Sequence, residues 1–441
     1  MQKAVVDKPE VTTAERFSSV RRQTLELCEP LTPEDMMVQS CAEASPAKWH
    51  LAHTTWFFES FVLREFLPGY RPFDKEFVWL FNSYYETFSP FPEKRLRSSF
   101  SRPGLDEILR YREWVDEAVG RLLESEPPRE ALRRIELGAN HEEQHQELLL
   151  TDILHAFFTN PLRPRYREQA DIGTREPKDR ERGRVGRRDK GDAALCFSAF
   201  EGGLREIGDF GEGFCFDNEL PRHRVWLEPY ALAGRLVTCG EFAEFMADGG
   251  YRRPELWLSA GWDAVKRNGW RAPLYWTEQD GGWSAFTLRG SRGLDELAEA
   301  PVSHVSYFEA DAYARWAGCR LPTEFEWEAA AGGQPIEGNL LESGRLLPGP
   351  TDQLSQDKNG TMGFYGDCWE WTGSAYLGYP GFRPLEGALG EYNGKFMSGQ
   401  MVLRGGSCVT PRAHIRASYR NFFAPETRWQ FSGIRLAKAN L

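Results

Sequence analysis

Two histidines one helical turn apart are the residues whose spacing most directly suggests metal chemistry. His141 and His145 lie in the segment HEEQHQE, and residues four apart project from the same face of an α-helix. Both imidazoles can therefore bind one ion, and Gln144 shares their face. Glu147 lies about 200° around the helix from His145, so we do not expect it to bind the same ion.

A third ligand is available in the segment WHLAHTTW, which contains His50 and His53. His53 lies on a stripe with the i, i+3, i+4, i+7 spacing of a core-facing helix surface, whereas His50 lies nearer its edge. The other members of the stripe are Trp49, Ala52 and Trp56. We therefore predict that His53 joins the pair. Three neutral imidazoles suit zinc, iron(II) or copper and leave positions open for substrates, so the ligands alone do not identify the metal.

The elements that must position these histidines form a predicted bundle of four main helices over residues 12–161. Apolar residues recur there at spacings of three and four, as in LDEILRYREWVDEAVGRLLES. Ser45 followed by Pro46 predicts the start of the helix that carries His53, because serine can cap free amides and proline suits the first helical position.

The rest of the chain differs in composition and in hydrophobic pattern, and this difference predicts an α+β protein. Residues 162–192 are dense in charge of both signs and predict a solvated linker or mobile loop. A nucleic-acid arm is the alternative, but acidic residues dilute its charge. Residues 193–441 predict irregular β structure, interrupted by short helices at GEFAEFMADGG and SYFEADAYARWAG. Thr323, with Glu326 three residues later, predicts one more capped helix.

Composition narrows the class of protein. A chain of 441 residues is long enough for two or three domains, and a formal net charge of −11 argues against nucleic acid as a partner. The eight cysteines include no CxxC pair, which is typical of reduced thiols. No signal-peptide core or membrane span of roughly 18 apolar residues is present. We expect a cytoplasmic protein without a membrane partner, and the oligomeric state stays open.

Several motifs together resemble those of the ergothioneine sulfoxide synthases of the EgtB type. They are SPAKWHLAH, HEEQHQE, RLPTEFEWEAAA, GDCWEWT, VLRGGS and FSGIRLA. The first half resembles a DinB-like four-helix bundle, and the second resembles the formylglycine-generating-enzyme fold, a C-type-lectin-like domain that would form a wall of the substrate site. The resemblance implies a non-haem iron(II) cofactor. It also implies an O2-dependent reaction that joins a thiol to the imidazole carbon of hercynine and oxidises the sulfur to a sulfoxide.

The formylglycine-generating enzymes themselves hold copper(I) with two cysteines placed after the RGGS element. Thr410 and Ile415 occupy those places here, and Cys408 is alone in this stretch. The resemblance therefore disfavours copper chemistry.

Substrate contacts are further expectations from the resemblance. Gln144 and Asn421 match positions that contact hercynine, and Phe422 falls where an aromatic ring could pack on the trimethylammonium group. Phe423 stands where mycobacterial members carry an aspartate for the γ-glutamyl group. Free cysteine is therefore the expected thiol.

Tyr84 and Tyr85, in NSYYETFSP, are the expected catalytic tyrosines. Mycobacterial members carry a catalytic tyrosine in the second domain, but the segment PGFRPLEGALGEYNG does not clearly supply one. A phenol near the metal can donate a proton or an electron and favour sulfoxide formation over simple thiol oxidation.

A cation for the cysteine carboxylate is expected just after NSYY. Arg97 is the first candidate, with Lys94 and Arg95 as rivals, because a guanidinium suits a carboxylate through its bidentate geometry. Arg420 and Arg416 are further candidates.

Two other functions fit the same motifs. The architecture could act on γ-glutamylcysteine, a selenosugar or histidine, as in the selenoneine and ovothiol synthases. A zinc-dependent thiol transferase or a lectin-like binding protein is the non-redox alternative.

Overall fold

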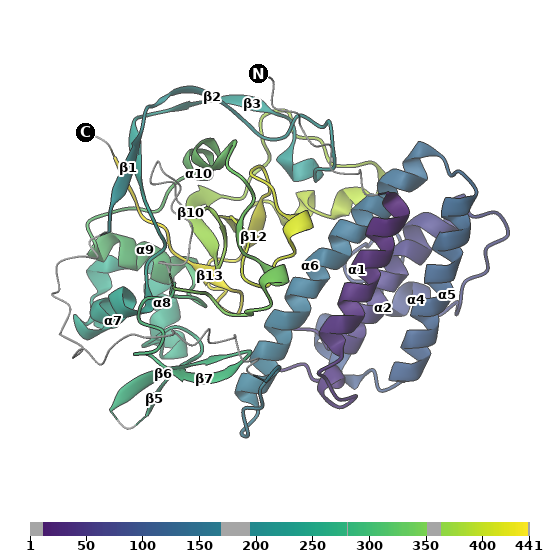
Figure 1. Ribbon diagram of the computed structural model, residues 1–441, viewed down its shortest axis with the longest axis horizontal. Coiled ribbons are helices and arrows are strands. Elements are labelled where there is room, and N and C mark those ends of the chain that lie inside the picture. Colours follow the sequence, from purple (N-terminus) through teal and green to yellow (C-terminus); the bar gives the residue numbers. More distant parts are fainter. Residues whose placement is uncertain (1–11, 169–194, 280, 351–362, 440–441) are drawn as a thin grey trace, which may run out of the picture. The chain divides into compact units, whose positions relative to one another are not determined.

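The computed structural model describes residues 12–168, 195–279, 281–350 and 363–439 (Figure 1). Most of the predicted charged linker, from residue 169 onward, lies outside the described residues. The chain forms two compact units. Of the described residues, the first unit comprises 12–159, 210–220 and 381–395, and the second comprises 160–168, 195–209, 221–279, 281–350, 363–380 and 396–439. Two short segments of the second half of the chain thus belong to the first unit.

Helices α1, α2, α5 and α6 of the first unit form the predicted bundle (Figure 1). Its helices are α1 (Thr13–Cys28), α2 (Ala47–Phe58), the π-helical turn η2 (Glu59–Leu63), α3 (Arg64–Phe66), α4 (Phe77–Leu80), α5 (Leu105–Glu124) and α6 (Arg129–Thr159). The 3₁₀ turns include η1 (Asp35–Met37), η3 (Lys94–Ser99), η4 (Asp217–Glu219) and η9 (Gly387–Glu391). The helical periodicity therefore predicted the main elements correctly.

Helix α2 lies at the centre of the bundle, and all of its residues are buried. It contacts both α5 and α6. The predicted serine cap is wrong. Pro46 occupies the N-cap position without a side-chain cap, while the Ser45 amide donates to Asp152 Oδ2 at 2.8 Å and its hydroxyl accepts from Arg97 at 2.8 Å. Tertiary partners thus replace the local cap.

A buried ionic cluster fixes α6 against its neighbours. Glu142 of α6 accepts hydrogen bonds from Arg21 of α1 at 2.9 Å and from Arg112 of α5, and all three side chains are at most 4% exposed. Removing one partner of a buried ion pair costs about 3–5 kcal/mol, because the other charge is left unpaired. The cluster therefore holds the helix that carries His141 and His145.

The second unit contains short sheets and four α-helices among its described residues. The helices are α7 (Cys239–Ala247), α8 (Ser259–Asn268), α9 (Tyr307–Trp316) and α10 (Glu324–Ala331). Strands β1 (Phe197–Phe200), β4 (Tyr230–Ala233) and β14 (Ala437–Ala439) form one sheet, in the order β1-β4-β14. Strands β10 (Trp369–Ala375), β11 (Met401–Arg404), β12 (Asn421–Phe423) and β13 (Ser432–Gly433) form another, in the order β12-β11-β10-β13.

Smaller sheets complete this unit. They are the ribbon of β2 (Gly203–Ile207) with β3 (His223–Leu227), the sheet of β5 (Trp276–Gln279), β6 (Gly282–Thr287) and β7 (Gly290–Gly293), and the pair β8 (Gly338–Asn339) with β9 (Tyr365–Gly366). The α+β prediction is confirmed.

Local signals explain most of the helices in the second unit. Thr323 caps α10 and forms the predicted capping box with Glu326. Helix α8 was not among the predicted helices, and its segment contains Gly261, a poor helix former. A Cβ at Gly261 would lie 2.8 Å from Phe308 of α9. Close packing of α8 on α9 therefore requires the glycine.

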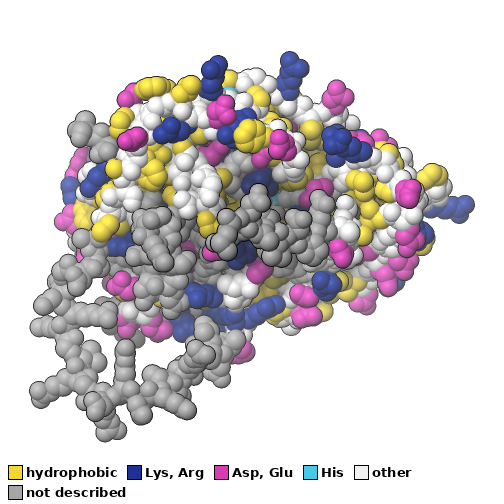
Figure 2. All heavy atoms as spheres, turned by 45° about the horizontal axis from the view of Figure 1, so that its top comes forward, with side chains coloured by type: hydrophobic (Ala, Val, Ile, Leu, Met, Phe, Trp, Pro, Cys, Tyr) yellow, Lys and Arg dark blue, Asp and Glu magenta, His cyan; other side chains and the backbone are white. Residues whose placement is uncertain are grey.

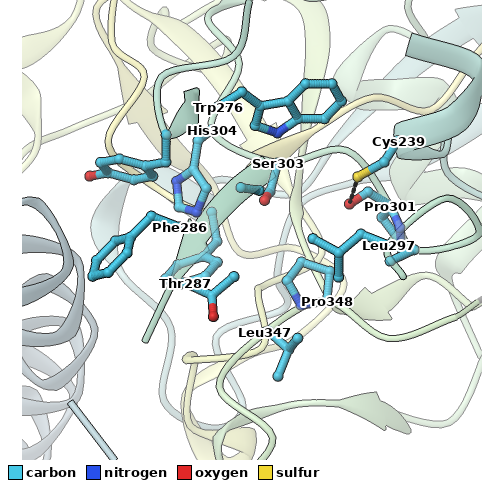
Figure 3. A pocket seen from close by; sticks show the side chains of 14 residues that line it. Cys239, Trp276, Phe286, Thr287, Leu297, Pro301, Ser303, His304, Leu347 and Pro348 are labelled. Atoms are coloured by element: carbon cyan, nitrogen blue, oxygen red, sulfur yellow. Dashed lines mark hydrogen bonds between the residues drawn. The ribbon is translucent and has the colours of Figure 1, made fainter. Parts of the chain in front are cut away.

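A small, mostly apolar pocket lies within the second unit (Figure 3). Its lining includes Cys239, whose thiol donates to the carbonyl of Pro301 at 3.6 Å, and His304. His304 has a left-handed backbone (φ 63°) and is 6% exposed. Burial lowers its pKa to about 3, while backbone hydrogen bonds to Gln430 and Trp429 act in the opposite direction.

Charged side chains of both signs are interspersed on the face drawn in Figure 2. The coloured residues there show no large area of one sign. None of the helices in the described ranges combines the length and the apolar character that crossing a membrane requires.

Candidate metal centre

Three histidines from two helices converge inside the first unit. His53 comes from α2, and His141 and His145 come from α6. One ring nitrogen of each lies within 4.8 Å of the others. The ring centroids are 4.6 to 5.0 Å apart. The structure therefore groups the three histidines that the sequence analysis selected.

The ring of His53 is fixed on both faces and at one nitrogen. Trp49 stacks on it at 4.4 Å and Trp56 at 5.4 Å between ring centroids, with interplanar angles of 14° and 13°. Its Nδ1 lies 2.6 Å from the carbonyl oxygen of Phe81. A carbonyl only accepts, so Nδ1 carries the proton. Nε2 keeps its lone pair, and it has no hydrogen-bond partner among the described residues.

His141 and His145 present neutral rings to the same space. Burial lowers the pKa of His141 to about 3, against the opposing charge of Glu142. Burial, together with the neighbouring His141, also holds the pKa of His145 well below its ordinary value. Because a neutral imidazole is the form that binds metals, both rings are prepared as ligands.

The donor set fits a first-row transition metal. Both ring nitrogens of His141 and Nε2 of His53 are buried and lack hydrogen-bond partners in the described part of the chain. Buried polar atoms are rarely left without a partner, and a metal ion would provide one. Imidazole ligands suit iron, zinc and copper alike.

Arg97 is a buried cation beside this cluster. Its guanidinium is 4% exposed and lies 3.4 Å from the ring centroid of Trp49, the ring that stacks on His53. It donates to the hydroxyls of Ser45 at 2.8 Å and Ser83 at 3.0 Å. No carboxylate of the described residues lies within 4.0 Å of it. Burial lowers the pKa of Arg97, but an arginine stays protonated in proteins.

The other predicted cations have different surroundings. Lys94 is exposed, and Arg95 pairs at the surface with Glu93 at 2.5 Å. Arg420 donates to both carboxylate oxygens of Glu324, at 2.8 and 3.0 Å. Arg416 donates to the carbonyl of His414 at 3.0 Å. Arg97 therefore combines burial with an absence of carboxylate partners better than these rivals.

The two predicted tyrosines lie together in the first unit. Tyr84 and Tyr85 stack with ring centroids 4.6 Å apart, and their hydroxyls are 3.5 Å apart. Tyr85 also contacts Trp56, at 5.6 Å between ring centroids. Trp56 in turn stacks on His53, so the ring of Trp56 lies between Tyr85 and the histidine cluster.

Tyr392 is a further neighbour of the cluster, and it lies in the segment PGFRPLEGALGEYNG, which was not expected to supply a tyrosine clearly. It lies in the segment 381–395, which belongs to the first unit, and its hydroxyl donates to Gln144. Its ring centroid lies 5.6 Å from that of His141. Gln144 and Tyr392 are 248 residues apart, so no local pattern could pair them.

Two carboxylates hold the segment that carries Tyr392. Glu391 accepts from the amides of Glu86 at 3.1 Å and Thr87 at 3.0 Å, directly after the two predicted tyrosines. Asp217 accepts from Asn393 at 2.7 Å. All three tyrosines are therefore held by one hydrogen-bonded assembly within the first unit.

The predicted hercynine contacts of the second half lie in the second unit. Asn421, Phe422 and Phe423 form β12 and pair with β11. Phe422 stacks on Tyr376 at 4.0 Å between ring centroids, so one face of its ring is covered. Their part in a site with the histidines stays a prediction.

Both halves of the chain match known families. Residues 16–149 match the DinB superfamily, and residues 197–346 and 339–440 match the Sulfatase-modifying factor enzyme 1-like domain. The formylglycine-generating enzyme of Streptomyces coelicolor is 30% identical over 289 residues, covering 54% of this chain and 87% of that protein.

Two hercynine oxygenases are also similar to this chain in sequence. The hercynine oxygenase of Mycolicibacterium smegmatis is 31% identical over 453 residues, which covers 97% of this chain and 98% of that protein. The hercynine oxygenase of Mycobacterium tuberculosis is 38% identical over 240 residues, which covers 50% of this chain and 55% of that protein. The latter match thus spans about half the length of its relative.

The fold and the site together define a class of two-domain proteins, in which a DinB bundle with a histidine cluster precedes a Sulfatase-modifying factor enzyme 1-like domain. Near full-length similarity is more specific than either domain match. The chain belongs to the hercynine oxygenase family.

Proposed function

We propose that this chain is an iron(II)-dependent enzyme that uses dioxygen to join cysteine to hercynine, giving hercynylcysteine sulfoxide in ergothioneine biosynthesis. Family membership supports an oxidoreductase that acts on hercynine. The observation that carries the proposal is the convergence of three neutral imidazoles beside Arg97, a buried cation without a carboxylate partner.

The reaction balances without another reductant. The hercynine C–H bond and the cysteine S–H bond are broken, and a C–S bond forms. One oxygen atom of O2 becomes the sulfoxide oxygen, and the other leaves as water with the two hydrogens. The two organic substrates thus supply all four electrons that reduce O2.

His53, His141 and His145 would hold the metal. When bound, iron(II) supplies the redox chemistry that dioxygen requires and that zinc lacks. Three protein ligands leave further positions open for substrates. Iron(II) is therefore the metal that matches both the donor set and the oxygen-dependent reaction.

Arg97 would bind the carboxylate of cysteine. The Ser45 and Ser83 hydroxyls orient its guanidinium, and Trp49 covers one face. A carboxylate would supply the charged partner that this buried cation lacks, through short charge-assisted hydrogen bonds. Arg97 would thereby place the thiol of cysteine near the histidine cluster.

The tyrosines would supply a proton. Burial raises the pKa of both Tyr84 and Tyr85, so both phenols keep their protons at neutral pH and can act as donors. Tyr392 is a third candidate because its hydroxyl contacts Gln144. Gln144 in turn matches the position expected to contact hercynine.

Cysteine is the proposed thiol because Phe423 replaces an acidic residue expected for γ-glutamyl recognition. A phenyl ring cannot form an ion pair with the ammonium group of the longer substrate, as a carboxylate can. Asn421 and Phe422 are the proposed hercynine contacts of the second unit.

Product identification tests this proposal. Anaerobically purified, iron-loaded protein receives hercynine, an equimolar mixture of cysteine and γ-glutamylcysteine, and oxygen, and the products are identified by mass spectrometry. We expect the cysteine sulfoxide conjugate to predominate. A predominant γ-glutamylcysteine conjugate would contradict the assignment of cysteine as the thiol, and so would a predominant selenium-containing conjugate in a parallel assay with a selenosugar. The absence of any conjugate would contradict the reaction itself.

A further inference from the structure

His50, the histidine not grouped with the cluster, contacts one of its members. Its Nδ1 lies 2.8 Å from Nδ1 of His145. Its Nε2 lies 3.1 Å from Oδ2 of Asp152. His50 is 2% exposed and Asp152 is 6% exposed. An uninterrupted chain of hydrogen bonds therefore runs from a buried carboxylate to a candidate metal ligand.

The chemistry of the three groups determines where the protons lie. An ionised carboxylate only accepts, so His50 Nε2 must be the donor to Asp152. A neutral imidazole carries a single ring proton, which leaves His50 Nδ1 as an acceptor. The 2.8 Å contact between the two Nδ1 atoms then requires a proton on His145 Nδ1. His145 Nε2 is left with its lone pair.

Asp152 is itself held in position. Its Oδ2 accepts from the backbone amide of Ser45 at 2.8 Å. That amide can only donate, so an acceptor must occupy this position. Ser45 lies two residues before α2 and Asp152 lies on α6. The anchoring bond thus joins the two helices that carry the cluster.

We infer that Asp152 and His50 form a positioning relay, which fixes His145 in the tautomer whose Nε2 keeps a lone pair for binding a metal ion. The inference rests on the metal centre of the proposed function and adds two residues to it. Neither residue is a ligand. Both act through His145, by setting which nitrogen carries the proton and how the ring is oriented.

The cluster offers an internal comparison. His53 is fixed in the same tautomer by the Phe81 carbonyl, at 2.6 Å from Nδ1. In His141, by contrast, neither ring nitrogen has a hydrogen-bond partner among the described residues. Two of the three candidate ligands are therefore oriented before metal binding, one by the backbone and one by the relay.

The first measurement needs no metal. Histidine labelled with nitrogen-15 in the metal-free full-length protein reports which ring nitrogen is protonated, through its long-range proton–nitrogen NMR correlations. We expect His145 to carry its proton on Nδ1 and His50 on Nε2. Protonation of His145 on Nε2, or double protonation of His50, would overturn the relay even if the enzyme were fully active.

The second measurement compares iron(II) affinities by anaerobic competition with a chelator. His50→Phe removes both polar atoms, and we expect roughly 10- to 100-fold weaker binding, the usual effect of losing a group that orients a metal-bound histidine. His50→Asn places an amide oxygen near the old Nδ1, where it can accept from His145, and should recover much of the affinity. His155→Phe is a control on α6, the helix that carries His145 and Asp152, because His155 contacts Ser40, which is not part of the relay, at 2.7 Å.

The outcomes separate the inference from the proposed function. Wild-type affinity in His50→Phe would overturn the relay. Binding abolished equally in His50→Phe, His50→Asn and His53→Phe would also overturn it, because His50 would then be a ligand. A wild-type protein that binds no iron(II), with the predicted tautomers intact, would contradict the proposed function alone. If His50→Phe does not fold, the iron(II) affinity of His50→Asn and the NMR measurement on the wild-type protein still test the relay.

Discussion

At the scale of single residues, Arg97 is a buried cation that has no carboxylate partner among the described residues. A buried charge is costly unless it is paired and hydrogen-bonded, and the hydrogen-bond partners of Arg97 are the neutral hydroxyls of Ser45 and Ser83. We expect Arg97→Gln to raise the KM for cysteine roughly 10- to 100-fold, which corresponds to the loss of about 1.5–3 kcal/mol from a charged hydrogen-bonded contact.

The matched control for Arg97 is Arg95→Gln. Arg95 lies two residues away but is exposed and pairs with an exposed carboxylate of Glu93, and such surface pairs contribute little. The KM should stay at the wild-type value in this control, and iron(II) affinity should be unchanged in both variants. An unchanged KM in Arg97→Gln would remove Arg97 from thiol recognition.

The three tyrosines near the cluster make a second prediction at this scale. Replacing the residue that donates the proton by phenylalanine should leave iron(II) binding intact but change the ratio of sulfoxide to other oxidised thiol products. The variants are Tyr84→Phe, Tyr85→Phe and Tyr392→Phe, with Tyr70→Phe as the control, because the Tyr70 hydroxyl donates to Glu59 at 2.6 Å. Chromatography of the products gives the ratio, and an unaltered ratio in all three variants would exclude a tyrosine from the mechanism.

At the scale of secondary-structure elements, the packing of α6 on α2 depends on a glycine. A Cβ at Gly138 of α6 would lie 2.5 Å from the ring of Phe58. We expect Gly138→Ala to destabilise the bundle by about 1–3 kcal/mol, since overpacking outweighs the gain in helix propensity. Gly120 of α5 has nothing within 4 Å of its would-be Cβ, so Gly120→Ala should instead stabilise the bundle by about 0.4–1 kcal/mol.

Urea unfolding followed by circular dichroism measures both glycine variants against the wild type. The two midpoints should move in opposite directions. A midpoint for Gly138→Ala at or above that of Gly120→Ala would contradict the close helix contact.

The elements also show what local sequence can predict. The four main helices and the Thr323 capping box could be predicted, because hydrophobic periodicity and capping depend on residues that are close together in the sequence. Periodicity also selected His53, but the reason given for His50 is wrong, because α2 is buried on every face and has no edge at which His50 could lie. The structure groups His53 with the pair, while His50 turns to His145 and Asp152.

At the scale of the whole molecule, the two units are assembled from interleaved segments. Tyr392 lies far along the chain, yet its segment belongs to the first unit, where it meets Gln144. Contacts of this kind depend on tertiary structure and leave no periodic signal. The sequence therefore predicted the histidine cluster, whose members lie on two helices, but not the tyrosine beside it.

The second unit should lose stability in acid because of His304. The unfolded chain has an ordinary histidine pKa near 6.5, whereas burial lowers the pKa of folded His304 to about 3. Between these pH values the unfolded state binds more protons, so the free energy of unfolding decreases as the pH falls, by at most about 1.4 kcal/mol per pH unit. His304→Asn should reduce this loss, because asparagine does not titrate and tolerates a left-handed backbone (φ 63°). Parallel curves of unfolding midpoint against pH for this variant and the wild type would contradict the prediction.

The central claim is that the histidine cluster supports an oxygen-dependent coupling of hercynine with cysteine. Its most direct test is to supply oxygen-18-labelled dioxygen to the iron-loaded protein with both substrates, and to measure the mass of the product by mass spectrometry. We predict a conjugate that contains one labelled oxygen atom and does not form when His141 is replaced by alanine. A conjugate without label, or equal product from zinc-loaded protein without oxygen, would contradict the claim.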